Sequence, residues 1–162
     1  VLLLVGAEVS RLGMAWLTFD AASRRAVAGE TDAAIQGLQH AIALDPGKSL
    51  YHHGLGSVYA RAFDASRDKE MFRLAHAEFK EAIELNPLDS RLLGLLGQLY
   101  VSAAQAPSLS GGLDEQRKSW IRAALRVYER AVRLAPFSAP CRYDQARLHL
   151  MLGEKAAAEQ QA

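Results

Sequence analysis

The histidines are the residues of this sequence best suited to binding a metal ion, but their spacing argues against it. His52 and His53 are adjacent, and adjacent residues on a helix point about 100° apart, which disfavours joint binding of one ion. His40, His76 and His149 lie in separate stretches and form no HExxH or Cys/His pattern. We therefore expect no metal site.

Other catalytic signatures are also missing from the sequence. The GxG at 54–56 falls in a stretch that reads as a helix, not in the strand-to-helix turn that binds a dinucleotide. No nucleophile elbow, phosphate-binding loop or Cys-x-x-Cys pair occurs. Glu78, Glu81 and Glu84 recur at helical spacing and are expected to form one solvated face. The sequence therefore predicts no catalytic residue, no cofactor and no enzymatic activity.

Composition is typical of one helix-rich domain. The chain has 162 residues, of which 50% are apolar and 7% aromatic, with five prolines. Its net charge of +1 gives no electrostatic reason to expect a nucleic acid as partner. The single cysteine, Cys141, permits no internal disulfide and leaves the cellular compartment open.

One helical pattern recurs three times along the chain. It reads AIQGLQHAIALDP at 34–46, AHAEFKEAIELNP at 75–87 and ALRVYERAVRLAP at 124–136. Steps of four and three residues place its anchors on one helical face, and a proline ends each copy. These anchors are Ala34, Leu38, Ala41 and Pro46, then Ala75, Phe79, Ala82 and Pro87, then Ala124, Tyr128, Ala131 and Pro136.

A different helical element precedes two of the copies. HHGLGSVY at 52–59 and LLGLLGQLY at 92–100 share Leu-Gly, two residues and Tyr. Glycine inside a helix costs about 1 kcal/mol relative to alanine, so its repetition at Gly56 and Gly97 predicts close helix packing. Paired helices that cannot bury their faces alone must stack, which predicts an all-α solenoid of antiparallel helix hairpins.

Together the two elements resemble the signature of the tetratricopeptide repeat (TPR) family, W-x2-L-G-x2-Y followed by A-x3-F and P. The resemblance implies a TPR-type α-solenoid with repeats at about 15–48, 49–89, 90–138 and, in part, 139–162, after a leading apolar helix at 1–14. His52 and Leu93 stand at the family's Trp position. A HEAT-like solenoid has a similar period but would not explain the Leu-Gly-x2-Tyr elements.

The repeats are longer than the family period of about 34 residues. Pro46 and Pro87 are 41 residues apart, and Pro87 and Pro136 are 49 apart. The distance from each Leu-Gly to the following Ala exceeds the family spacing by the same number of residues as the proline spacing does. Both insertions are therefore expected between the two helices of a repeat. The first, around 64–71, is rich in charged helix formers, whereas the second, 106–113, is rich in Gly, Ser and Pro and predicts a loop.

The opening VLLLVGAEVSRLGMAW leaves two interpretations open. One is an amphipathic helix leading into the first repeat. The other is the end of a membrane helix whose beginning precedes Val1, with Arg11 at the interface and the segment acting as a membrane tether. Glu8 and Arg11 interrupt the apolar run, which falls short of the roughly 20 residues that span a bilayer, and no signal-peptide pattern is present.

In the TPR family the first helices of the repeats line a concave groove that binds a partner. The groove positions that the resemblance implies here are Trp16, Phe19, Ser23, His53, Ser57, Arg61, Arg91, Gln98, Tyr143 and Arg147. The Lys and Asn with which some TPR proteins clamp a terminal carboxylate are replaced by His53 and Ser57, so a chaperone-tail receptor is not expected. Arg61, Arg91 and Arg147 would favour an acidic partner unless they are simply solvated.

Two functions follow from these observations. The favoured one is a scaffold that binds a protein or peptide partner in the groove without catalysis. The other rests on a weaker resemblance of the apolar opening, AxxGExDxAI, Leu-Asp-Pro and Tyr-His-His-Gly-Leu-Gly to the C-terminal tails of bacterial O-antigen ligase and polymerase membrane proteins. It implies the soluble tail of a bacterial envelope glycan ligase or polymerase. Location stays open between the cytoplasm and the periplasmic face of the inner membrane.

Overall fold

The described part of the chain is built from helices alone. The computed structural model describes residues 2–110 and 114–153, and within these ranges it contains no strand, which confirms the all-α prediction. The helices are α1 (Leu2–Val27), α2 (Thr31–Leu44), α3 (Ser49–Ser66), α4 (Lys69–Leu85), α5 (Ser90–Gln105), α6 (Pro107–Ser110), α7 (Asp114–Leu134) and α8 (Ala139–Met151).

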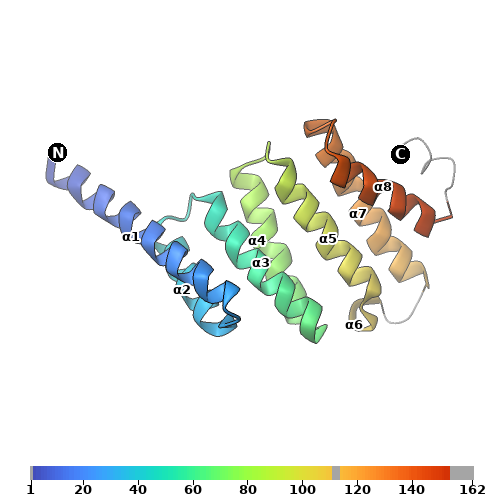
Figure 1. Ribbon diagram of the computed structural model, residues 1–162, viewed down its shortest axis with the longest axis horizontal. Helices are drawn as coiled ribbons and strands as arrows, with labels where there is room; N and C mark the ends of the chain where they lie inside the picture. The colour runs from blue at the N-terminus through green and yellow to red at the C-terminus, as the bar shows by residue number, and fades with distance from the viewer. Residues whose placement is uncertain (1, 111–113, 154–162) are drawn as a thin grey trace.

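The helices form hairpins that stack side by side. α1 packs on α2, α3 on α4 and α5 on α7, and successive hairpins meet through α2 and α3, α4 and α5, and α7 and α8 (Figure 1). This is the antiparallel-hairpin solenoid that the sequence predicts. The last segment of the chain, 154–162, for which a closing helix is expected, lies outside the described residues.

The stack has two distinct edges. Turns 45–48, 86–89 and 135–138 join one repeat to the next, and we call their side the interrepeat edge. The turns inside repeats at residues 28–30 and 67–68, together with the short helix α6, form the opposite hairpin edge. α1, α3, α5 and α8 all start at the interrepeat edge (Figure 1).

The repeated anchors form the core. The six anchor alanines are fully buried, and Leu38, Phe79 and Tyr128 are almost fully buried. A Cβ built on Gly56 would lie 2.8 Å from the Phe79 ring, and one on Gly97 would lie 2.7 Å from the Tyr128 ring. The repeated glycines therefore allow the large residue of each second helix to pack against the backbone of its partner, as expected.

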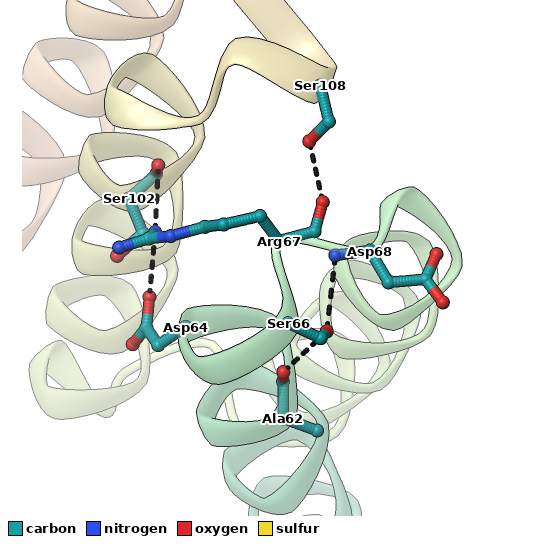
Figure 2. A network of polar contacts seen from close by, with 7 residues as sticks. All are labelled: Ala62, Asp64, Ser66, Arg67, Asp68, Ser102 and Ser108. Carbon is teal, nitrogen blue, oxygen red and sulfur yellow. Dashed lines mark hydrogen bonds and ion pairs between the residues drawn. The ribbon is translucent and has the colours of Figure 1, made fainter.

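The two insertions meet at the hairpin edge. The first lengthens α3 and α4, so that only Arg67 and Asp68 join them, with Arg67 in the left-handed region at φ 57°. Part of the second is a short helix, α6, where the sequence predicts a loop. Ser108 of α6 donates a hydrogen bond of 2.6 Å to the Arg67 carbonyl, and Arg67 Nη1 lies 3.5 Å from the Ser102 carbonyl (Figure 2). The expected loop is therefore partly helical because it docks on the first insertion.

The lengthened helices also share an aromatic cluster. The ring centroid of Phe72 lies 5.6 Å from that of Phe63 and 5.2 Å from that of Trp120. Nearby, His76 Nε2 and Tyr100 Oη are 3.0 Å apart. These contacts join α3, α4, α5 and α7, and aromatic pairs of this kind stabilise the packing of the helices.

The leading apolar segment and the first helix of the first repeat are one continuous helix, α1. Residues 6 and 8–14 are all exposed, whereas Ala15 is fully buried. Within the described residues, no helix combines the length and the apolar character that crossing a bilayer would require.

Candidate functional site

A cleft of about 730 Å³ opens between α3, α5 and the start of α8. Its apolar walls come from Leu50, Leu92, Leu95 and Pro140. Its polar lining combines both charges and neutral groups, namely Lys48, His53, Asp89, Arg91, Gln98 and Asp144. Apolar walls combined with convergent polar groups are typical of a binding cleft.

The middle of α5 leaves the cleft open. Gly94 lines it, and a Cβ built on this glycine would meet no atom within 4 Å. Counted three residues before the Leu-Gly glycine or its equivalent, the other repeats carry Phe19, His53 and Tyr143 at this position. Gly94 therefore has no packing role like that of Gly97, and the missing side chain creates space for a ligand.

An ion pair at the start of α5 forms one wall. The carboxylate of Asp89 accepts hydrogen bonds from the Arg91 backbone N–H at 3.0 Å and from its guanidinium at 2.8 and 3.0 Å. The hydrogen bond from the Arg91 side chain lowers the pKa of Asp89. Arg91 is thus paired within its own helix start, which reduces its attraction for an acidic partner.

His53 presents a neutral ring to the cleft. It is half-buried, and burial lowers its pKa below the ordinary value near 6.5, with Arg91 acting in the same direction and Asp89 opposing. At pH 7 the ring therefore offers one hydrogen-bond donor and one acceptor.

Tyr128 lies at the floor between α5 and α8. Its ring is 1% exposed, and its hydroxyl makes no hydrogen bond to another described group. Burial raises the pKa of Tyr128 far above 10, and the nearby carboxylate of Asp144 adds to the effect. The Tyr128 hydroxyl therefore stays protonated. The carboxylate of Asp144 forms an ion pair with Arg147, with 3.6 Å between the charged atoms.

A second, smaller cleft continues the first toward the hairpin edge. It measures about 190 Å³ and is lined by Ser57, Arg61 and Asp64 of α3 and by Ser102 of α5. It shares Leu95 and Gln98 with the larger cleft. Together the two clefts form a groove along the α3–α5 interface.

The structure places five of the implied groove residues on these clefts. These residues are His53, Ser57, Arg61, Arg91 and Gln98. Trp16, Phe19 and Ser23 of α1 and Tyr143 and Arg147 of α8 line neither cleft. Among them, Trp16 and Phe19 form an aromatic series that reaches Tyr51 of α3, with ring centroids 5.7 and 5.0 Å apart. The assignment of all ten residues to a partner-binding groove stays a prediction.

Sequence reasoning missed several lining residues and misplaced one carboxylate. Lys48, Asp89, Gly94 and Asp144 line the larger cleft, and the sequence pattern contains no signal that distinguishes Gly94 as a cleft residue from the packing glycine Gly97. The expectation that Glu78 belongs to a solvated face is wrong, because it is half-buried and hydrogen-bonded to His52 across the hairpin.

Comparisons with known proteins identify the architecture. No protein-family model and no curated protein sequence matches the chain. Several solved TPR structures do. A TPR protein from Thermus thermophilus, TTC0263, aligns with a TM-score of 0.70 at 19% identity, covering 91% of this chain and 70% of its own. MamA aligns with a TM-score of 0.69 at 17% identity, covering 91% and 73%.

The first TPR domain of Spaghetti (RPAP3), solved with the HSP90 peptide SRMEEVD, is similar along nearly its whole length. It aligns with a TM-score of 0.67 at 16% identity, covering 87% of this chain and 97% of its own. At such identities the likeness establishes the fold.

Proposed function

The chain is an α-solenoid with the tetratricopeptide repeat fold, and from that premise we propose that it is a non-catalytic scaffold that binds a peptide or protein segment. The ligand lies in the groove between α3, α5 and α8. The single observation that carries this proposal is the larger cleft, held open by Gly94 in the middle of a helix.

The walls favour an apolar anchor. Leu50, Leu92 and Leu95 surround the space above Gly94 and have the chemistry to receive one large apolar side chain of the ligand. The polar groups of the rim then contact the ligand backbone, and neutral His53 supplies both a donor and an acceptor.

The charges of the groove favour no strongly charged ligand. Arg91 is paired with Asp89, and Arg147 lies beside Asp144. Among the described residues that line the two clefts, Arg61 and Lys48 take part in no ion pair, so any attraction for an acidic partner rests on these two cations. The structure of the RPAP3 domain with an HSP90 peptide supports a peptide as the ligand class.

The proposal is tested with a substitution that fills the larger cleft and leaves the helix core unchanged. Peptides are first selected from a random library on the wild-type protein, and their affinities are then measured for Gly94→Leu. We expect affinity to fall at least about tenfold, because the leucine occupies the anchor space. Ala77→Leu, which introduces a leucine at an exposed position of α4, is the matched control.

The proposal fails if the selected peptides bind Gly94→Leu and wild type equally well. It also fails if Ala77→Leu weakens binding as much as Gly94→Leu, since binding would then depend on the opposite layer of helices.

A further inference from the structure

Two adjacent histidines of α3 face different surroundings. His52 is buried within the hairpin, where Glu78 and the Pro46 carbonyl oxygen lie within hydrogen-bonding distance of its two ring nitrogens. The charges of Glu78 and Glu81 on α4 also act on this ring. His53, by contrast, is half-buried and lines the larger cleft. Adjacent residues on a helix point about 100° apart, so one ring serves the fold and the other is available to a ligand.

His53 borders the space that Gly94 leaves open. Each of the two stands three residues before the glycine of its Leu-Gly pair, so they occupy equivalent positions on α3 and α5. Both line the larger cleft, together with Leu50, which lies one turn before His53. An apolar ligand side chain placed above Gly94 and against Leu50 therefore covers the part of the His53 ring that water reaches in the free protein.

The charged groups around His53 do not favour a positive charge on its ring. Burial lowers the pKa of His53, the carboxylate of Asp89 opposes this shift, and the charge of Arg91 adds to it. Asp89 already accepts hydrogen bonds from the guanidinium and the backbone N–H of Arg91. Among the described residues, the other ionised side chains that line the larger cleft are Lys48 and Asp144.

Helices α1 and α2 contribute apolar groups beside the same turn of α3. A Cβ built on Gly54, the residue after His53, would lie 3.1 Å from the side chains of Phe19 of α1 and Leu38 of α2. Apolar surroundings disfavour the charged form of a histidine, because they cannot replace the water that solvates it.

We propose that mild acidification weakens ligand binding in the groove, because the ligand covers the His53 ring and binds more tightly when that ring is neutral. This inference rests on the proposed peptide-binding function and adds its regulation. Covering the ring removes the water that would solvate an imidazolium. Protonation also turns the acceptor nitrogen of the ring into a donor, so the ring can no longer accept a hydrogen bond from a backbone N–H of the ligand.

The direction of the effect follows from the linkage between binding and protonation. Because the ligand disfavours the charged ring, the pKa of His53 is lower in the complex than in the free protein. Affinity is therefore highest above pH 6.5, where the ring is neutral in both states, and it falls as the pH decreases through the free-protein pKa of His53. If the ligand lowers this pKa by one unit, binding weakens about tenfold once the pH is below both values.

His52 keeps the hairpin intact over the same range of pH. Its hydrogen bond to Glu78 raises its pKa, so the charged contact between α3 and α4 is fully formed below pH 6.5. The pKa of Asp89 is lowered by Arg91, so this carboxylate stays ionised at pH 5. Mild acidification thus changes the ligand site through His53 while the contact at His52 is retained.

Binding of a peptide without acidic or histidine side chains tests the proposal on the full chain. Peptides with blocked termini are selected at pH 7.5 from a library that lacks Asp, Glu and His, and those that Gly94→Leu weakens are kept. We expect the wild-type protein to bind them at least about threefold more weakly at pH 5 than at pH 7.5. For His53→Gln, the ratio of the two affinities should be about one. His40→Gln, at an exposed position of α2, should keep the wild-type ratio. Circular dichroism at both pH values checks that each variant is folded.

NMR titration of the imidazole Cε1–H groups locates the proton. We expect the pKa of His53 to be lower in the complex than in the free protein. The pKa of His76, which is also half-buried but lines neither cleft, should be the same in both. An equal or higher pKa of His53 in the complex overturns the proposal, as does a His53→Gln variant that keeps the wild-type dependence on pH.

Failure of this inference can be distinguished from failure of the proposed function. Peptides that Gly94→Leu weakens, but that bind equally well at pH 7.5 and pH 5, would overturn the coupling to His53 and leave the groove as the binding site. If Gly94→Leu weakens none of the selected peptides, both proposals are wrong.

Discussion

His52 Nδ1 lies 2.8 Å from Glu78 Oε2, while His52 Nε2 lies 3.1 Å from the Pro46 carbonyl oxygen. Both partners are acceptors, so the imidazolium, which donates from both ring nitrogens, satisfies them best. The hydrogen bond to Glu78 raises the pKa of His52, and burial opposes it only in part. His52 of α3 thus connects its own helix to α4 and to the turn 45–48 that precedes α3.

This contact predicts a stability that depends on pH. Because the folded-state pKa lies above the ordinary value near 6.5, the charged contact contributes fully below pH 6.5 and is lost as pH rises through the folded-state pKa. We expect His52→Gln to cost about 2 kcal/mol at pH 6 and less at pH 9. Urea unfolding at both values measures it, with the exposed His40→Gln as the control. A cost that grows with pH would refute the assignment.

Replacement by alanine should stabilise the protein at Gly94 of α5 and destabilise it at Gly97 of α5 and Gly56 of α3. Gly94→Ala places a Cβ in open space and should raise the free energy of unfolding by about 0.5–1 kcal/mol. Gly97→Ala forces the Tyr128 ring away and should lower it by about 1–3 kcal/mol, as should Gly56→Ala against Phe79. Chemical denaturation of the three variants compares them directly. Stabilisation by Gly97→Ala would contradict the packing described above.

The hydroxyl of Tyr128 offers a test of the cleft floor. Because Oη is buried without a hydrogen-bond partner, Tyr128→Phe should leave stability unchanged or raise it by up to about 1 kcal/mol. Thermal unfolding gives the comparison. A loss above about 1 kcal/mol would mean that Oη makes a stabilising hydrogen bond, with Asp144 as the nearest candidate.

The contact between the two insertions predicts that replacing Ser108 and replacing Ser102 by alanine change the stability of the protein by different amounts. Ser108→Ala removes the hydrogen bond to the Arg67 carbonyl and should cost about 1 kcal/mol. Ser102→Ala should cost much less, because Ser102 meets Arg67 through its backbone carbonyl. Amide hydrogen exchange of the α3–α4 turn should accelerate in Ser108→Ala alone. Equal effects of both substitutions would show that the insertions do not depend on this bond.

The sequence reveals the local part of this architecture. Residues equivalent to the anchors Ala75, Phe79 and Ala82 occur in each repeat. A glycine such as Gly97 indicates a close approach of two helices, because the repeats share the same packing geometry. Polar contacts between the helices are not periodic. Glu78 is half-buried and hydrogen-bonded to a histidine from the other helix of its hairpin, and no spacing rule relates the two.

The open space at Gly94 illustrates the same limit. Gly94 and Gly97 look alike as helical glycines in sequence, yet one Cβ would meet a ring and the other would meet nothing. Only the placement of α8 and α3 around α5 distinguishes a packing glycine from one that opens a cleft. The candidate site was therefore predicted in outline, through His53, Arg91 and Gln98, but its centre was not.

Mapping of a bound peptide by NMR tests the central claim most directly. On addition of a library-selected peptide to the wild-type protein, we expect the largest chemical-shift changes at the backbone amides of Gly94, Leu95 and Gln98, which border the shared part of the two clefts. Small changes are expected at Ala77 on the opposite layer of helices. The largest changes on α2, α4 and α7, with α5 unaffected, would contradict binding in the groove.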